Sequence, residues 1–250
     1  MLPAPGADPT PPQADPPQSG LGRLIALVEV LICSDYPTQL ALAATLVALG
    51  YSPVGSDGRL QVGFVAWLSL IDAVLLVGLI LLFLHAHGER PREVFFGRRP
   101  IAGEVAYGLP LTLVVLVIGM GALLAIRYVS PSLQTAPRNP LEDFLGSPRD
   151  AWLFALVVLI AGGVREEIQR AFLLHRFEVW LGGGAVGTIV TSIAFGAGHI
   201  LQGVDAAIVT GLLGAFWAAV YLRRRSAVAP IVSHAGFNLL QVLQYVMTRE

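Results

Sequence analysis

The chain lacks most of what keeps a soluble protein in solution. Only 13% of its 250 residues are charged, and lysine is absent, so that all 16 basic residues are arginine. An ordinary soluble domain has about 25% charged residues. Hydrophobic residues make up 55% of the chain, the mean hydropathy is +0.69, and several apolar runs reach the length of a membrane-spanning helix. These features predict a membrane protein.

Several functional signatures are also missing. The single cysteine, Cys33, excludes an intrachain disulfide, and no Cys-x-x-Cys or Cys/His metal pattern is present. The net charge of −1 provides no basic field for nucleic acid, so we expect no nucleic-acid partner. The sequence has no His-Glu-x-x-His, Gly-x-Gly-Asp or Gly-x-Ser-x-Gly motif and no phosphate-binding glycine pattern. These absences exclude the enzyme families that those motifs define.

Apolar segments dominate the rest of the chain and predict an all-α fold, a polytopic transmembrane bundle of about seven to eight helices. Lipid cannot satisfy free backbone groups, and the alternation typical of a barrel is absent, so we expect the spans to be helical. The first segment can split at Asp35–Pro37, because proline breaks or kinks a helix. The expected segments are 24–50, 60–84, 105–129, 151–174, 185–201, 205–222 and 227–247.

Two domains are predicted. Residues 1–22 are rich in proline and have almost nothing to bury, which is typical of a disordered tail. Residues 23–250 form the transmembrane helical domain. Arginine is concentrated in the connections after the second and sixth segments, which predicts a cytoplasmic N-terminus and an external C-terminus. The arginine-, alanine- and glycine-rich composition favours a bacterial source, and therefore the plasma membrane.

The fourth segment carries charges that an apolar helix does not need: Arg165, Glu166, Glu167 and Arg170. Ionisable groups inside a span are functional candidates by default. Glu166 and Arg170 are four residues apart, so they can pair on one helix face. The alternative is that the cluster marks a helix end, where long side chains reach the interface. That alternative is weaker for adjacent carboxylates, because apolar sequence resumes after them.

Two later segments carry histidines. His199 lies one turn after Phe195, and His234 lies one turn before Asn238 on the same helix face. The alternatives are a hydrogen-bonded core histidine for His199 and a helix–helix polar clasp for His234 and Asn238. Glu29, Asp35 and Asp72 are also unexpected in apolar segments, and we interpret them as interhelical hydrogen-bonding or boundary residues before substrate contacts.

Taken together, these groups have the chemistry to hydrolyse an amide. A partly desolvated carboxylate can accept and return a proton near neutral pH. Imidazole can orient water or bind a metal, and histidine and asparagine can donate hydrogen bonds to an oxyanion.

The ordered motifs resemble those of the CPBP family of intramembrane proteases. This family, also called the Abi domain, contains type II CAAX prenyl proteases and bacteriocin-processing relatives. The motifs are Glu166-Glu167 with Arg170, Phe195-x-x-x-His199 and His234-x-x-x-Asn238, and the resemblance covers a catalytic core at about 150–245. It implies a hydrolase that cleaves peptide or membrane-protein substrates within the bilayer.

The first motif departs from the family pattern. The family has Glu-Glu-x-x-x-Arg, whereas only two residues separate Glu167 from Arg170 here. If Arg170 anchors the alignment, Arg165 takes the first glutamate position. If the carboxylates anchor it, Glu166 takes that position and the arginine is displaced by one. We assign the water-activating role to Glu166, with Glu167 as the alternative.

The resemblance also implies the other roles. Glu166 with His199 would activate water, His234 with Asn238 would bind the oxyanion, and Arg170 would orient the carboxylates. Zinc on His199, His234 and Glu166 would make the enzyme a metalloprotease, although a metal-independent reaction is also described for the family. The alternative functions are a non-proteolytic scaffold or bacteriocin-immunity-type protein and, after it, an ion-coupled transporter.

Overall fold

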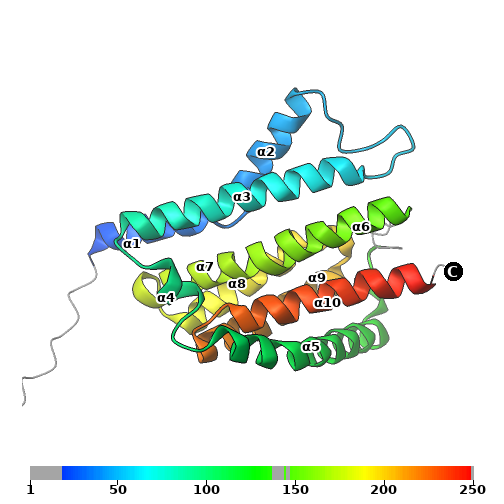
Figure 1. Cartoon of the computed structure of the whole chain (residues 1–250). Helices are drawn as coiled ribbons and strands as arrows, with labels where there is room; N and C mark the ends of the chain where they lie inside the picture. Colours follow the sequence, from blue (N-terminus) through cyan, green and yellow to red (C-terminus); the bar gives the residue numbers. More distant parts are fainter. Residues whose placement is uncertain (1–18, 137–143, 145–146, 249–250) are drawn as a thin grey trace, which may run out of the picture.

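The structure is a computed structural model that describes residues 19–136, 144 and 147–248, and it is helical there, with no strand (Figure 1). The predicted all-α class is therefore confirmed. Two short 3₁₀ turns follow α5 and α8, and a π-helix, η3, joins α6 to α7. The bounds are α1 Gly20–Ile32, α2 Tyr36–Ala48, α3 Val62–Ala86, α4 Pro91–Phe95, α5 Ile101–Val129, α6 Pro148–Val157, η3 Val158–Arg165, α7 Glu166–Trp180, α8 Gly184–Gly198, α9 Val204–Arg224 and α10 Val228–Thr248.

Not every predicted span has the length and composition of a membrane helix. Among the described residues, three helices do, namely α3, α5 and α9, and the bent pair α1 and α2 counts as a fourth. The helix α8 has only 15 residues, and charged residues open α7. Outward-facing apolar side chains such as Val74 and Val117, 76% and 72% exposed, suit a lipid environment. The chain is an integral membrane protein.

The first apolar segment splits where the sequence predicts. The helices α1 and α2 meet at an angle of 42° on either side of Asp35, and Pro37 occupies the first turn of α2. The helix α1 begins at Gly20, inside the predicted tail, and residues 1–18 of that tail lie outside the described residues.

The continuous rod α6–η3–α7 lies at the centre of the bundle. Figure 1 shows α3 along one side of it and α10, then α5, along the other. The core around α7 is apolar and aromatic, with Phe172 and Leu174 packed against Leu76 and Ile80 of α3. The charged motif therefore lies between α3, through Arg165 and Asp72, and α10, through Glu167 and His234.

The helix α10 packs closely against η3 and α5 at glycine residues of those two helices. A Cβ on Gly163 of η3 would lie 2.6 Å from Cβ of Ala235, and a Cβ on Gly108 of α5 would lie 2.7 Å from the carbonyl oxygen of Ala229. Small residues at such contacts let membrane helices pack backbone to backbone. This packing fixes the register of α10, which carries His234.

The arginine-bearing connections meet at one end of the bundle, as the orientation argument requires. The Ala227 N–H donates to the Phe95 carbonyl over 2.8 Å, and Arg224 pairs with Glu104 at 2.6 Å. Arg176, near the end of α7, pairs with Glu89 there at 2.7 Å. The predicted clustering is thus present, while the side of the membrane on which this end lies stays a prediction.

Candidate active site

The two adjacent glutamates of α7 lie in different surroundings. Glu167 is 2% exposed, and its Oε1 accepts hydrogen bonds from Arg170 and from Nδ1 of His234, the latter over 2.8 Å. A carboxylate buried with two donors is stabilised in its charged form. Glu167 therefore connects α7 to α10 through hydrogen bonds at its Oε1.

Glu166 is only loosely engaged. Its side chain is 16% exposed, and its nearest cationic neighbours are Nε2 of His234 at 3.7 Å and Nη2 of Arg165 at 4.0 Å. Both distances exceed a direct hydrogen bond. The oxygens of Glu166 are free to accept hydrogen bonds from a small molecule such as water.

The expected pairing of Glu166 with Arg170 is not what the structure shows. Arg170 pairs with Glu167, three residues before it, and its guanidinium lies 4.5 Å from the centre of the Phe195 ring. Glu166 faces Arg165 instead, because the side chain of that residue is turned toward the same side at the end of the π-helix. Arg170 therefore orients one carboxylate and not both.

His234 stands at the centre of the cluster and is 4% exposed. Its ring stacks on Trp217 of α9, with centroids 3.8 Å apart and planes 17° apart. The Trp217 indole N–H donates to Ser233 over 3.3 Å. The imidazole is thus fixed by Glu167 on one edge and by a flat aromatic wall on one face, so its orientation is set before any ligand binds.

His199 lies at the end of α8 and contacts the cluster through Phe195. Its Nδ1 lies 2.8 Å from the Phe195 carbonyl oxygen. A carbonyl only accepts, so Nδ1 donates, and the Nε2 of a neutral ring keeps its lone pair. The Phe195 ring lies 4.8 Å from the His199 ring and 6.0 Å from the His234 ring, which places it between the two histidines.

Asn238 lies one turn beyond His234 on α10 and faces the π-helix. A Cβ on Gly162 would lie 2.7 Å from its Nδ2. The absence of a side chain on Gly162 therefore makes room for the carboxamide. The structure thus brings Glu166, Glu167, Arg170 and His234 together directly, with His199 and Asn238 at the margins of the group.

Sequence reasoning missed two sets of contacts in this site, those of Trp217 and those of Arg165. Trp217 supports His234, yet a tryptophan in an apolar helix carries no signal of that role. Arg165 links Glu166 to Asp35 and Asp72. Those aspartates stood out in the sequence as unexpected charges, but their common partner was not identifiable.

The expected zinc ligands do not form a recognisable metal site. Across the described ranges, no group of three or more His, Cys, Asp or Glu side chains is placed to hold a metal ion.

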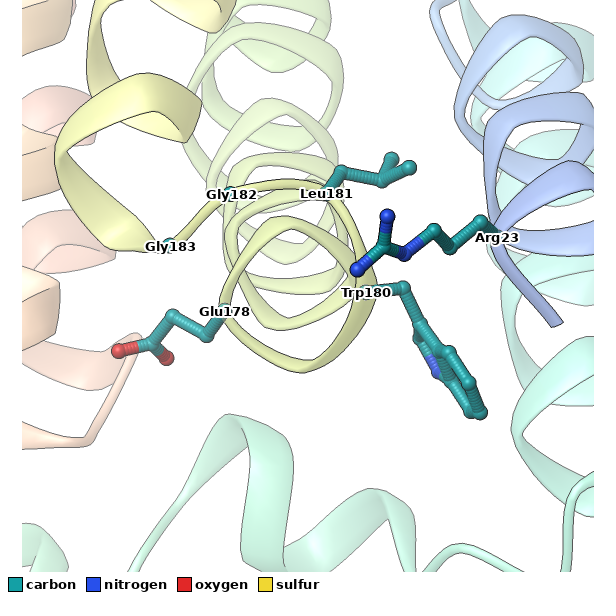
Figure 2. A pocket seen from close by; sticks show the side chains of 6 residues that line it. All are labelled: Arg23, Glu178, Trp180, Leu181, Gly182 and Gly183. Carbon is teal, nitrogen blue, oxygen red and sulfur yellow. The ribbon is translucent and has the colours of Figure 1, made fainter. Parts of the chain in front are cut away.

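A cavity of about 500 Å³ lies elsewhere, at the turn between α7 and α8 (Figure 2). None of the predicted site residues lines it. Its lining residues are Arg23, Glu178, Trp180, Leu181, Gly182 and Gly183. The chemistry of the charged motif, and not this cavity, therefore defines the candidate active site.

The fold and this cluster define a class, a helical membrane protein with a buried site of carboxylate, imidazole and guanidinium groups. Residues 148–240 match the family described as Type II CAAX prenyl endopeptidase Rce1-like. Over these residues the match confirms the resemblance that the three motifs carry, and it contains all six predicted site residues. No curated protein and no solved structure matches the chain.

The family match has a direct functional consequence. It supports a CAAX-protease-like intramembrane endopeptidase at the level of the family, and hence a hydrolase of peptide bonds. The helices α1 to α5 lie outside the matched residues.

Proposed function

We propose that this protein is an intramembrane endopeptidase in which Glu166 is the general base that activates the attacking water. The observation that supports this assignment is the difference between the two adjacent carboxylates. Glu167 accepts hydrogen bonds from Arg170 and His234. The carboxylate of Glu166 is partly exposed and makes no hydrogen bond within 3.5 Å in the part of the chain that is described. A general base must reach its water, and Glu166 meets that requirement.

His199 is proposed to orient the same water. With its Nδ1 proton donated to the Phe195 carbonyl, the neutral ring has Nε2 available as an acceptor. The backbone contact holds the ring in this tautomer, which is the form needed to accept a proton. Glu166 and His199 would then divide the work of removing a proton from water and returning it to the leaving amine.

His234 and Asn238 are proposed to stabilise the oxyanion. Glu167 accepts the Nδ1 proton of His234 and so aims Nε2 at the side on which Glu166 lies. When Nε2 also carries a proton, the imidazolium donates to the oxyanion. The negative charge of Glu167 stabilises this imidazolium. The Asn238 carboxamide supplies a second donor from the next turn of α10. Arg170 holds Glu167 in place.

The substrates are proposed to be membrane-associated peptides or proteins that reach the site from the bilayer. Zinc on Glu166, His199 and His234 is the alternative to water activation by Glu166 alone, and the experiment includes it. An orientation with the N-terminus in the cytoplasm of a bacterial cell stays a prediction.

The test is cleavage by the purified chain in liposomes. The probes are an internally quenched farnesylated peptide ending in a CAAX sequence and its unlipidated twin, each with and without a chelator. Glu166→Gln should lower cleavage by about 10²- to 10⁴-fold, the usual contribution of a general base, without changing the unfolding temperature. Glu167→Gln should lower both the rate of cleavage and the unfolding temperature, because it removes the negative charge that Arg170 and His234 share.

Glu93→Gln is the matched control, since the Glu93 side chain is 70% exposed on α4. It should match wild type in both readouts. Cleavage at the wild-type rate by Glu166→Gln would contradict the assigned base, and no cleavage of either peptide by wild type would favour the scaffold function. Loss of cleavage with the chelator, restored by zinc, would replace the proposed mechanism by a metal-dependent one.

A further inference from the structure

Arg165 connects the candidate base to the helices that lie outside the family match. It is the last residue of the π-helix and is 4% exposed. Its guanidinium faces carboxyl groups from three parts of the chain. Nη1 lies 2.8 Å from Asp35, Nε lies 3.9 Å from Asp72 of α3, and Nη2 lies 4.0 Å from Glu166.

Asp35 has an unusual backbone conformation that serves this contact. It occupies the N-cap position of α2 with φ +81°, and its side chain makes no capping hydrogen bond. An aspartate at an N-cap ordinarily accepts from the first turn of its own helix, and a positive φ is unfavourable for a residue other than glycine. Here the carboxylate instead contacts Arg165 and accepts from Gln39 over 2.7 Å. The break between α1 and α2 therefore turns Asp35 toward the π-helix.

Asp72 is the least satisfied group in this region. It is 0% exposed, no donor group hydrogen-bonds to either of its carboxylate oxygens, and Nε of Arg165, which faces it, also has no partner. The other polar group within hydrogen-bonding reach of Asp72 is the carboxyl group of Asp35. Buried polar groups are satisfied in the great majority of cases, so each exception calls for an explanation. Replacing Asp72 by a neutral residue would remove a neighbour of both Arg165 and Asp35 but would leave the 2.8 Å contact between those two residues in place.

We propose that Asp35 and Asp72 are positioning residues that act on Glu166 through Arg165. By facing two sides of the guanidinium, they fix its third side, Nη2, beside Glu166, and they keep that carboxylate near His234. This inference rests on the proposed role of Glu166 as the base. It means that the start of α2 and the middle of α3 complete the site, although the family match begins only at residue 148.

The test uses Asp72→Asn and Asp35→Asn in the liposome cleavage assay described above, beside wild type and Glu166→Gln. Each Asp→Asn variant should lower kcat by about 10- to 100-fold, as loss of an outer-sphere partner typically does, and should leave KM and the unfolding temperature near wild type. The conservative Asp72→Glu should recover part of kcat. Asp57→Asn, in the exposed loop before α3, is the matched control and should change neither.

The outcomes separate this inference from the proposed function. Active wild type and inactive Glu166→Gln, together with unchanged kcat in both Asp→Asn variants, would overturn the inference alone. A lower unfolding temperature with wild-type kcat for the folded fraction would do the same, because it would show a structural tie only. If Asp72→Asn does not fold, Asp35→Asn decides, since that side chain is 21% exposed. An active Glu166→Gln would overturn the proposed function itself.

Discussion

Two groups of carboxylate, imidazole and guanidinium side chains lie along α7, and they differ in how fully they are satisfied. The first is the candidate site at the start of the helix. The second, which we call the basic-end network, lies near its other end and consists of Glu29, His87, Glu89, His175 and Arg176. In the basic-end network each carboxylate has close partners. Arg176 lies 2.5 Å from Glu29 and 2.7 Å from Glu89, while His87 and His175 add contacts of 2.7 and 3.1 Å.

The candidate site follows a different rule. Oε1 of Glu167 accepts from two close donors, but the neighbouring Glu166 has partners only at 3.7 and 4.0 Å. The same residue types therefore have two different roles in this protein. In the basic-end network both carboxylates are engaged by close partners, although Nη2 of Arg176 is buried without one, and the contacts tie α1, α7 and the loop after α3 together. In the candidate site one carboxylate stays available for chemistry.

The strongest test of this contrast removes the central cation of the basic-end network. Arg176→Met keeps a side chain of similar length but leaves Glu29 and Glu89 without their arginine. Breaking a buried pair in this way typically costs about 3–5 kcal/mol of folding free energy. We expect a large drop in the unfolding temperature in detergent, with normal cleavage by the folded fraction. Arg90→Met, at an 82% exposed side chain, is the control, and an equal effect of the two changes would refute the structural role.

A second test disturbs the candidate site by packing alone. Gly163→Ala would place a methyl group 2.6 Å from Cβ of Ala235, beside His234. Overpacking of this kind costs about 1–3 kcal/mol, and the displacement of α10 should also lower the rate of cleavage. Gly78→Ala in α3 is the control, because nothing lies within 4 Å of the added atom. The control should be neutral or slightly stabilising. Wild-type stability and rate in Gly163→Ala would show that the close approach is not needed.

The smallest expected effect is a pH dependence of the basic-end network. Burial raises the pKa of Glu89, but hydrogen bonds from His175 and Arg176 outweigh it and hold the pKa below its usual 4.5. The unfolded chain then binds more protons than the folded one in acid. The contribution of Glu89 is therefore full above about pH 4.5 and is lost as the pH falls through the lowered value. Glu89→Gln should flatten this part of the dependence of unfolding temperature on pH, and an unchanged slope would assign it to other groups.

Much of the fold was predictable from hydropathy, because an apolar run of sufficient length has few alternatives in a membrane. The split at Asp35 was predictable because proline acts locally. The π-helix was not, since Val158–Arg165 has no residue that requires the wider turn. Nor was the continuity of α6, η3 and α7, which depends on packing against α3 and α10.

The candidate site was predictable as a set of residue types and only partly as an arrangement. Ionisable side chains in otherwise apolar segments identified Glu166, Glu167 and His234 as candidates, because such groups are rare there without a function. Sequence patterns could not show that Glu167 is the one that pairs with Arg170, or that Trp217 supports His234. Trp217 and His234 lie on different helices, whose relative rotation a single sequence does not determine. Glu166 and Glu167 both lie within one turn of Arg170 on the same helix, so spacing alone does not choose between them.

The π-helix before Glu166 bears on the two possible alignments of the shortened motif. A π-turn closes on the fifth residue and not on the fourth, so it takes up about one residue more than an α-turn over the same rotation. Each residue after the π-helix therefore lies at about the angle around the helix axis that the preceding residue would have without it. Counting from Arg170 gives Arg165 the first glutamate position, but this shift carries Glu166 to the angle that Arg165 would have in an uninterrupted α-helix. Because Glu166 and Arg170 both follow the π-helix, it turns the two residues together relative to α6 and leaves their own four-residue spacing unchanged. The π-helix therefore sets the direction in which the whole charged motif points, while the shortened spacing decides which carboxylate Arg170 reaches.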